Sequence, residues 1–156
     1  MKYDPFTLRV ALNKSGSARG ELYLDDGETF SHRDGKLIWR EFVAEKPLKQ
    51  SRILRLTSKD LALEKPDDAV DGVALKRFNP ANEFAKSIEE VRVEKVVIIG
   101  LSAKPTSVKV EGGKDLVWEY TAGVGAGGKK EAVASVLAIK DPKVLVTKDW
   151  AIVVQL

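Results

Sequence analysis

The strongest indication of fold is the segment Gly20-Glu21-Leu22-Tyr23-Leu24-Asp25-Asp26-Gly27. Leu22 and Leu24 alternate with polar or amphipathic neighbours, which is the period-two pattern of a strand with one buried face. Asp26-Gly27 follows directly, and Asp-Gly next to an alternating segment is a strong hairpin signal because glycine tolerates a positive φ. The segment therefore predicts a strand over residues 21–25 that ends in a tight turn.

The same alternation continues on both sides of this segment. Residues 6–12 place four apolar side chains on one face, and the cluster 13–17 indicates a turn before the next strand. Asp34-Gly35 indicates a second Asp-Gly turn. The segment Val96-Val97-Ile98-Ile99 is a continuous apolar run, which favours a strand that is buried on both faces. Further strands are predicted over residues 37–43, 51–57, 91–101, 107–111, 116–121, 133–139 and 150–156.

One short helix interrupts the strands. Asn79 can cap the first orphan N–H groups, and Pro80 suits the first helical position because its missing donor costs nothing there. Ala81, Phe84 and Ile88 then follow at helical spacing. About ten short strands, frequent turns and one helix predict an all-β fold, an antiparallel β-sandwich with long loops. Residues 1–156 would form this domain, with 60–90 as a variable loop and helix insertion.

Composition limits the classes of function. With 156 residues, of which 44% are hydrophobic, the chain can bury one core but is shorter than the roughly 250 residues of a (β/α)8 barrel. It has no cysteine and a single histidine, His32, which excludes disulfides and zinc sites of several imidazoles. The net charge of +3 is spread along the chain, so no nucleic-acid partner is expected. No apolar run approaches about 18 residues, so no membrane span or signal peptide is expected.

A glycine-rich segment matches two phosphate-binding patterns, G-x-G-x-x-G and G-x-x-x-x-G-K. It reads Gly123-Val124-Gly125-Ala126-Gly127-Gly128-Lys129-Lys130. A nucleotide site would need backbone N–H groups and a following helix N-terminus to face the phosphate. Lys130 stands where a magnesium-binding Ser or Thr is needed, and the preceding strands lack alternating βα units. We therefore favour a hairpin connection before the strand at 133–139, with nucleotide binding as the alternative.

Other residue groups have a chemical and a structural interpretation. Asp25, Asp26 and Glu28 beside His32 could bind a hard cation or act as general acid and base, but the calcium-loop spacing is not met. We favour a tight turn with solvated acids, followed by a surface histidine. Asn13 begins an Asn-Lys-Ser glycosylation sequon in a predicted turn.

Aromatic side chains could stack on sugar rings or fill the core. Trp118 and Trp150 lie in predicted strands, so we expect them to pack in the core of the sandwich. Trp39 is left open between the two roles. Trp39 and Tyr23 are the first candidates for an exposed aromatic row of the kind that a carbohydrate-binding module would need.

Two segments resemble the C-terminal β region of family-31 glycoside hydrolases. The first is Asp4-Pro5-Phe6-Thr7-Leu8-Arg9-Val10-Ala11-Leu12 with Gly20-Glu21-Leu22-Tyr23-Leu24-Asp25-Asp26-Gly27-Glu28-Thr29-Phe30. The second is Val96-Val97-Ile98-Ile99-Gly100-Leu101 with the terminal Lys148-Asp149-Trp150-Ala151-Ile152, which resembles the end of glucosidase II catalytic α subunits. The likeness runs from about residue 4 to the C-terminus and is weak over 60–90.

The resemblance implies a part of an α-glucosidase of the endoplasmic reticulum lumen. Such enzymes remove α-1,3-linked glucose from N-glycan precursors with retention, using two aspartates on a (β/α)8 barrel. That barrel would precede this region, and no residue here maps onto either aspartate, so no catalytic residue, cofactor site or metal ligand is assigned. The expected partners are the N-terminal catalytic barrel portion and a glucosidase II β subunit, with glycan bound elsewhere. The alternative is a free-standing carbohydrate-binding β-sandwich module.

Overall fold

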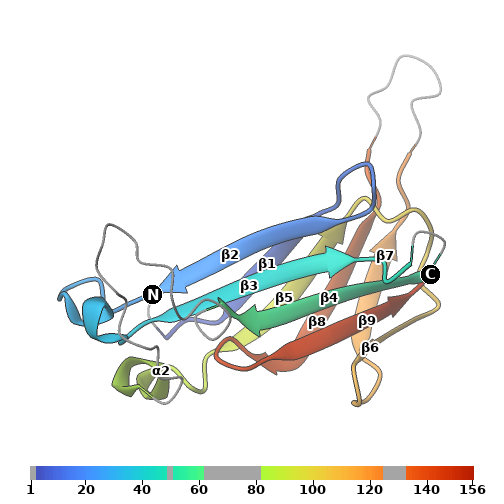
Figure 1. Ribbon diagram of the computed structural model, residues 1–156. Coiled ribbons are helices and arrows are strands. Elements are labelled where there is room, and N and C mark those ends of the chain that lie inside the picture. The colour runs from blue at the N-terminus through green and yellow to red at the C-terminus, as the bar shows by residue number, and fades with distance from the viewer. Residues whose placement is uncertain (1–2, 49–50, 62–81, 125–132) are drawn as a thin grey trace.

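Two sheets pack face to face in the computed structural model, which describes residues 3–48, 51–61, 82–124 and 133–156 (Figure 1). One sheet has five strands and the other four, and little of the described chain is helical. The prediction of an all-β sandwich is confirmed. Within the described ranges, no helix is long and apolar enough to cross a membrane.

The five-stranded sheet is antiparallel throughout and has the order β2-β3-β4-β9-β6. Its strands are β2 (Ala18–Leu24), β3 (Ile38–Glu45), β4 (Ile53–Asp60), β9 (Trp150–Gln155) and β6 (Ser107–Val110). The last strand in sequence, β9, therefore lies inside the sheet between β4 and β6.

The four-stranded sheet has the order β1-β5-β8-β7 and contains one parallel pair. Its strands are β1 (Phe6–Ala11), β5 (Arg92–Ile99), β8 (Val136–Leu145) and β7 (Val117–Thr121). β1 runs parallel to β5, whereas β5, β8 and β7 are antiparallel to their neighbours. The expectation of a wholly antiparallel sandwich is therefore wrong for β1. The turn after β1 crosses to the other sheet, so β1 cannot form a hairpin with β2.

The core lies between the two sheets and follows the period-two pattern of the sequence. Leu54 and Ile152 from one sheet and Val96 and Leu137 from the other are fully buried. Each such side chain contributes about 1.5–3 kcal/mol relative to an exposed one. The run 96–99 is buried on one face only. Val96 and Ile98 lie in the core, but their neighbours are half-exposed because the outer face of β5 has no second layer.

Residues 25–37 connect β2 to β3 by a longer path than the predicted tight hairpin. A 3-10 helix, η1 (Ser31–Asp34), follows the first Asp-Gly pair and ends at Asp34 of the second. Gly27 and Gly35 have φ values of 67° and 81°, so both glycines adopt the positive φ expected of the Asp-Gly pairs, but neither pair closes a tight hairpin. β2 and β3 still pair as neighbouring antiparallel strands, but a 13-residue loop, residues 25–37, connects them instead of a two-residue turn.

The short helix α2 (Glu83–Ser87) closes one end of the sandwich, and its Phe84 and Ala85 pack into the core (Figure 1). Asn82 is its N-cap: Oδ1 accepts a hydrogen bond from the Ala85 N–H (2.8 Å), and Nδ2 donates to the Leu37 carbonyl (3.1 Å). The predicted cap Asn79 with Pro80 lies outside the described residues, as does most of 60–90. The described helix begins later than predicted because Asn82 supplies both a cap and a tertiary contact.

β8 continues beyond the predicted end at residue 139 and reaches Leu145. Asp141 and Lys143 have positive φ values of 42° and 59° on either side of Pro142. This irregularity is tolerated because β7 pairs with β8 only as far as Lys140, so proline removes no hydrogen bond on that side.

Candidate functional site

The flanks of the glycine-rich segment form a β-hairpin. Val124 and Val133 exchange backbone hydrogen bonds of 2.9 and 3.0 Å, which extends the antiparallel β7–β8 pair. Gly123 lies so close to the opposite strand that an added Cβ would be 2.6 Å from the Val133 carbonyl oxygen. Residues 125–132 lie outside the described residues. The hairpin interpretation is confirmed for the flanks, and β8 stands where a nucleotide site would need a helix.

The acidic segment after β2 is organised by its own hydrogen bonds. Asp26 accepts the N–H groups of Glu28 (3.2 Å) and Thr29 (3.0 Å) and the hydroxyls of Thr29 and Ser31. Asp25 accepts the backbone N–H two residues later (2.9 Å). The hydroxyl of Thr29, followed by these N–H groups, holds the pKa of Asp26 well below its usual 3.8. The carboxylates thus stabilise the loop, whereas the sequence predicted solvated acids in a tight turn.

His32 is half-buried on the same loop rather than fully exposed. Its Nδ1 lies 3.8 Å from a carboxylate oxygen of Asp25, too far for a hydrogen bond, and its ring centroid is 6.2 Å from that of Phe30. Among the described residues, no group of three or more His, Asp or Glu side chains is arranged to hold a metal ion. The imidazole of this loop therefore packs beside Phe30, and the carboxylates of Asp25 and Asp26 accept hydrogen bonds from the loop itself.

Tyr23 and Trp39 lie directly opposite each other on the outer face of β2 and β3. Tyr23 is 47% exposed, and the Trp39 indole donates a hydrogen bond to Glu21 (3.0 Å). Burial of part of its ring raises the pKa of Tyr23, and the nearby Asp25 carboxylate adds to this rise. The structure thus brings the two predicted aromatic candidates together, beside the carboxylates of Glu21 and Asp25.

Trp118 and Trp150 pack against the core, as predicted. The Trp150 indole N–H donates to the Leu145 carbonyl (3.1 Å), and its ring centroid lies 5.9 Å from that of Phe42. A tryptophan at the margin of a core usually buries its ring while its indole N–H donates a hydrogen bond, as Trp150 does here.

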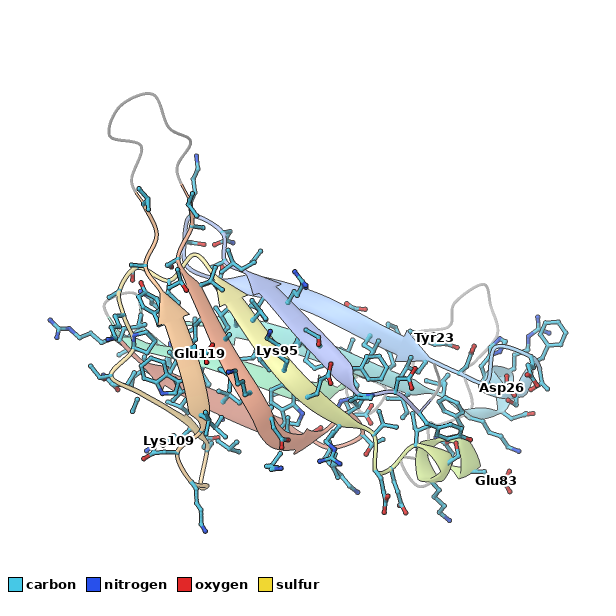
Figure 2. The ribbon with its side chains drawn as sticks, turned by 180° about the vertical axis from the view of Figure 1, so that it is seen from behind. Tyr23, Asp26, Glu83, Lys95, Lys109 and Glu119 are labelled. Atoms are coloured by element: carbon cyan, nitrogen blue, oxygen red, sulfur yellow. The ribbon has the colours of Figure 1, made fainter. Side chains whose placement is uncertain are left out.

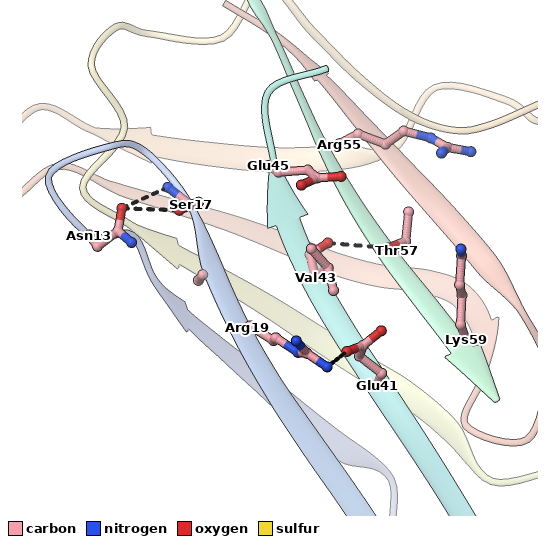
Figure 3. Close-up of a pocket in the computed structure, with 10 residues that line it drawn as sticks. Asn13, Ser17, Arg19, Glu41, Val43, Glu45, Arg55, Thr57 and Lys59 are labelled. Carbon is pink, nitrogen blue, oxygen red and sulfur yellow. Dashed lines mark hydrogen bonds and ion pairs between the residues drawn. The ribbon is translucent and has the colours of Figure 1, made fainter. Parts of the chain in front are cut away.

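A shallow pocket of about 550 Å³ lies on the outer face of the five-stranded sheet (Figure 3). It is formed by the β1–β2 turn and by the outward side chains of β2, β3 and β4. Its lining residues are Asn13, Ser17, Ala18, Arg19, Glu41, Val43, Glu45, Arg55, Thr57 and Lys59. The residues are mostly polar, and none of them is aromatic.

The charges of this pocket balance one another across the strands. Arg19 forms an ion pair with Glu41, which also lies opposite Lys59 in the sheet register. Glu45 lies opposite Arg55 in the same way. Opposite charges that face each other across strands stabilise the sheet by a few tenths of a kcal/mol to about 1 kcal/mol per pair. The pocket therefore has no strong field of one sign, in agreement with the small net charge of the chain.

Asn13 of the glycosylation sequon is exposed at the rim of this pocket. Its Oδ1 accepts the backbone N–H groups of Ser15 (2.9 Å) and Ser17 (3.1 Å), and Figure 3 shows the contact with Ser17. This is an Asx turn, which explains why the chain reverses here. Asn13 therefore shapes the crossing from β1 to β2.

An apolar cleft of about 460 Å³ opens between the edge strands β1 and β2. These strands belong to different sheets, so no ladder of backbone hydrogen bonds closes this side of the sandwich. Apolar lining residues include Phe6, Leu8, Val10, Leu22, Phe42 and Leu56.

A buried arginine was not foreseen from the sequence. Arg40 on β3 is 1% exposed and donates to the hydroxyl of Ser58 (2.9 Å), the Lys148 carbonyl (2.7 Å) and the carboxylate of Asp149 (2.7 Å). The buried Asp60 lies 3.7 Å from its Nη1. These contacts join β3, β4 and the turn between β8 and β9. By joining these three segments, Arg40 has a structural role in the sandwich.

A signal for this cluster was present in the sequence. Arg40 occupies the inward phase of β3, and Ser58 and Asp60 occupy the inward phase of β4. Polar residues in the buried phase of two neighbouring strands indicate an internal network. Recognising it required the knowledge that β3 and β4 are neighbours and that Arg40 lies opposite Asp60.

Comparison with known proteins gave matches over nearly the whole chain. No protein-family model matches it. Neutral alpha-glucosidase AB of Dictyostelium discoideum is 31% identical over 155 residues, which cover 97% of this chain and 12% of that protein. A probable glucan 1,3-alpha-glucosidase of Arabidopsis thaliana is 32% identical over 153 residues, which cover 97% of this chain and 14% of that protein.

Solved structures agree with these relatives. The structure of an ER glucosidase II heterodimeric complex, with the catalytic subunit and the binding domain of the regulatory subunit, matches with a TM-score of 0.70 and 30% identity. A DNJ-bound glucosidase II alpha subunit matches with a TM-score of 0.72 and 32% identity. Each match covers 99% of this chain and 15% of the other. The chain thus spans a small part of the proteins that it resembles.

Proposed function

Because the chain belongs to the family-31 glycoside hydrolases of the glucosidase II type, we propose that it acts as the non-catalytic, C-terminal β-sandwich domain of an α-glucosidase. The observation that carries this proposal is the match over 99% of this chain to only 15% of a glucosidase II catalytic subunit. A region of that size and fold is one domain of a larger enzyme.

The whole enzyme would hydrolyse α-1,3-linked glucose, which is the linkage named for the Arabidopsis relative. In this proposal, glucose is removed from N-glycan precursors in the endoplasmic reticulum lumen. Two carboxylates on the barrel would perform the reaction with retention of configuration. The domain itself would support the barrel, because its internal polar groups are engaged in stabilising the sandwich and its connecting loops.

A regulatory β subunit is the second proposed partner. One structural relative is a complex of a catalytic subunit with the binding domain of a regulatory subunit. That assembly supports an equivalent partner for the enzyme to which this domain would belong. The Asn13 sequon, exposed in a turn, is compatible with passage through a glycosylating compartment.

The test compares this chain with the full-length polypeptide that contains it. We expect the full-length protein to release glucose from an α-1,3-linked glucosyl disaccharide and the 156-residue chain to release none. Adding the chain to the full-length enzyme should leave the rate unchanged. Release of glucose by the chain alone, or an inactive full-length protein that is folded and soluble, would contradict the proposal.

A carbohydrate-binding module is the second candidate function, and the pairing of Tyr23 with Trp39 favours it. Both rings lie on one outer face, and Glu21 beside them could accept hydrogen bonds from sugar hydroxyls. Titration of the chain with glucosyl and mannosyl oligosaccharides, followed by tryptophan fluorescence, tests this role. Saturable binding that is lost in Trp39→Ala and kept in Trp118→Ala would favour the module, and absence of binding would remove it.

A further inference from the structure

We propose that the end of the sandwich carrying Tyr3, Tyr23 and Phe30 packs against the catalytic portion of the same polypeptide. We call this surface the aromatic end. The inference rests on the proposed function, since it requires that the chain be one domain of a longer glucosidase. It goes beyond the proposed function by naming the surface of the domain that contacts the rest of the enzyme.

Exposed aromatic rings gather at one end of the described molecule. Phe30 is 71% exposed, Tyr3 65% and Tyr23 47%, whereas the other large exposed apolar side chains among the described residues are aliphatic. Figure 2 shows Tyr23 at the end of the sandwich where the loop of Asp26 and the helix of Glu83 also lie. β1 begins at the same end (Figure 1), and Tyr3 precedes its first residue, Phe6, by three positions. Exposed apolar groups gathered in one place mark surfaces that bind another protein surface.

The loop that carries Phe30 is held in a fixed shape. Asp26 accepts four hydrogen bonds from the loop, and the left-handed Gly35 ends η1. Lys36 joins the loop to α2 through an ion pair with Glu83 (2.8 Å). The guanidinium of Arg33 lies 4.7 Å above the Phe30 ring. A pre-organised ring loses little conformational entropy when it docks, which is what an interface anchor requires.

A groove of about 480 Å³ lies beside Tyr3 and adds a concave part to this surface. It runs between the segment of Tyr3 and Pro5 and the connection from α2 to β5, with Ile88 and Val91 in its wall. Interfaces combine protruding aromatic side chains with pockets that receive side chains of the partner. The aromatic end has both.

The occupant follows from chain geometry. The matched glucosidases carry this region as 12–15% of their length, so each has a large remainder. β1 starts at the aromatic end, so polypeptide that precedes it in an enzyme of this family would arrive there (Figure 1). Interfaces between domains of one chain bury about 600–1,500 Å² and are more polar than obligate interfaces. Tyr, Phe and Arg are among the residues enriched at such contacts.

Hydroxyl-radical footprinting of the full-length enzyme tests the inference with an internal control. Leu48 has the same exposure as Phe30, 73% against 71%, but lies in the turn after β3 at the opposite end (Figure 1). Phenylalanine is intrinsically the more reactive side chain. We expect Phe30 to be oxidised more slowly than Leu48 in the full-length enzyme. Oxidation of Phe30 at or above the Leu48 rate would overturn the inference. Protection of Phe30 that disappears when the enzyme is diluted would also overturn it, because the aromatic end would then be covered by a second copy of the enzyme.

A pair of variants tests the same contact by function. Phe30→Ala should shorten the half-life of α-glucosidase activity during heating by about tenfold, the effect of losing one interface anchor. Leu48→Ala should leave it unchanged. If the wild-type enzyme is active, equal half-lives for the two variants would overturn the inference. An inactive wild-type enzyme would instead contradict the proposed function. Both side chains are exposed within the domain, so neither variant is expected to prevent folding.

Discussion

Arg40 is the largest fully buried side chain of the described residues, although it is charged. It contacts Ser58, Asp149 and the Lys148 carbonyl and stands beside Asp60. Such a network holds strands at fixed positions because each hydrogen bond has a required direction. Its energetic importance lies in what remains when Arg40 is lost, since Ser58 and Asp60 stay buried.

Replacing Arg40 by alanine should destabilise the domain by about 3–5 kcal/mol, the usual result of breaking a buried ion pair from one side. The matched control is Arg19→Ala, which removes an exposed arginine from an ion pair with Glu41 and should cost about 1 kcal/mol or less. Urea unfolding followed by tryptophan fluorescence measures both. A loss for Arg40→Ala no larger than that for Arg19→Ala would contradict a central role for this network.

Asp26 should make stability depend on pH in the acid range. Its pKa is lowered in the folded state by the Thr29 hydroxyl and neighbouring N–H groups. A carboxyl with a depressed folded pKa stabilises the fold at pH values above its unfolded pKa, and this contribution is lost as pH falls through the folded value. The loss therefore occurs below about pH 4.

Thermal midpoints at pH 7, 4 and 2.5 test this dependence in the wild type and in Asp26→Asn. The wild type should lose more stability than the variant between pH 4 and 2.5, because the variant has no carboxyl to protonate at this position. Equal slopes in the two proteins would show that Asp26 does not control the acid response.

The hairpin of β7 and β8 has no room for a side chain at Gly123. Gly123→Ala would place a Cβ 2.6 Å from the Val133 carbonyl oxygen and 2.8 Å from the Ser135 nitrogen, both backbone atoms. We expect a loss of about 1–3 kcal/mol, as in other overpacked sites. Gly20→Ala on β2 is the control, since nothing lies within 4 Å of its added Cβ. Chemical denaturation should give a lower free energy of unfolding for Gly123→Ala than for Gly20→Ala. Equal free energies of unfolding would contradict the close approach of the strands at Gly123.

α2 depends on Asn82 for its start and for its position. Asn82→Ala removes the cap and leaves the Leu37 carbonyl without its side-chain donor, at a cost of about 2–3 kcal/mol. Asn82→Ser keeps a capping oxygen and should lose less. Comparing the urea midpoints of both variants with the wild type measures this. A serine variant as unstable as the alanine variant would assign the whole effect to the contact with Leu37.

Elements were predictable where the information is local. The alternation in 6–12 and 51–57 reports burial of one face, so β1 and β4 were expected within a few residues. β2 starts earlier than predicted, because Ala18 and Gly20 have weak strand propensity and are held by pairing with β3.

Features that depend on neighbouring strands could not be read from one sequence. The parallel partner of β1 and the pairing of Arg40 with Asp60 depend on which strands lie side by side. The same holds for the aromatic end, since Tyr3, Tyr23 and Phe30 are separated in sequence and come to the same end of the sandwich only through the fold. Tyr23 and Trp39 were foreseen as candidates by residue type, but their direct pairing required the β2–β3 register.

At the scale of the whole molecule, both sheets share one core and should unfold together. Leu54→Ala removes a fully buried side chain of β4 and should cost about 2–5 kcal/mol. Trp118 lies in the four-stranded sheet and Trp150 in the five-stranded sheet, so single-tryptophan variants report each sheet separately. The two probes should give the same urea midpoint before and after the substitution. Separate midpoints would show that the sheets are independent units.

The cleft between β1 and β2 has a consequence for how the sandwich opens. On that side, only apolar contacts such as those of Phe6, Leu22 and Phe42 hold the layers together, and no ladder must break for them to part. Among the described strands, β1 pairs with β5 alone, so its amides should exchange with solvent deuterium when this one-sided ladder opens locally. Amides of β4 and β9, which have a partner strand on both sides, should exchange only when the whole domain opens. Local opening of the sandwich should therefore begin at the β1 side of this cleft rather than in the central strands.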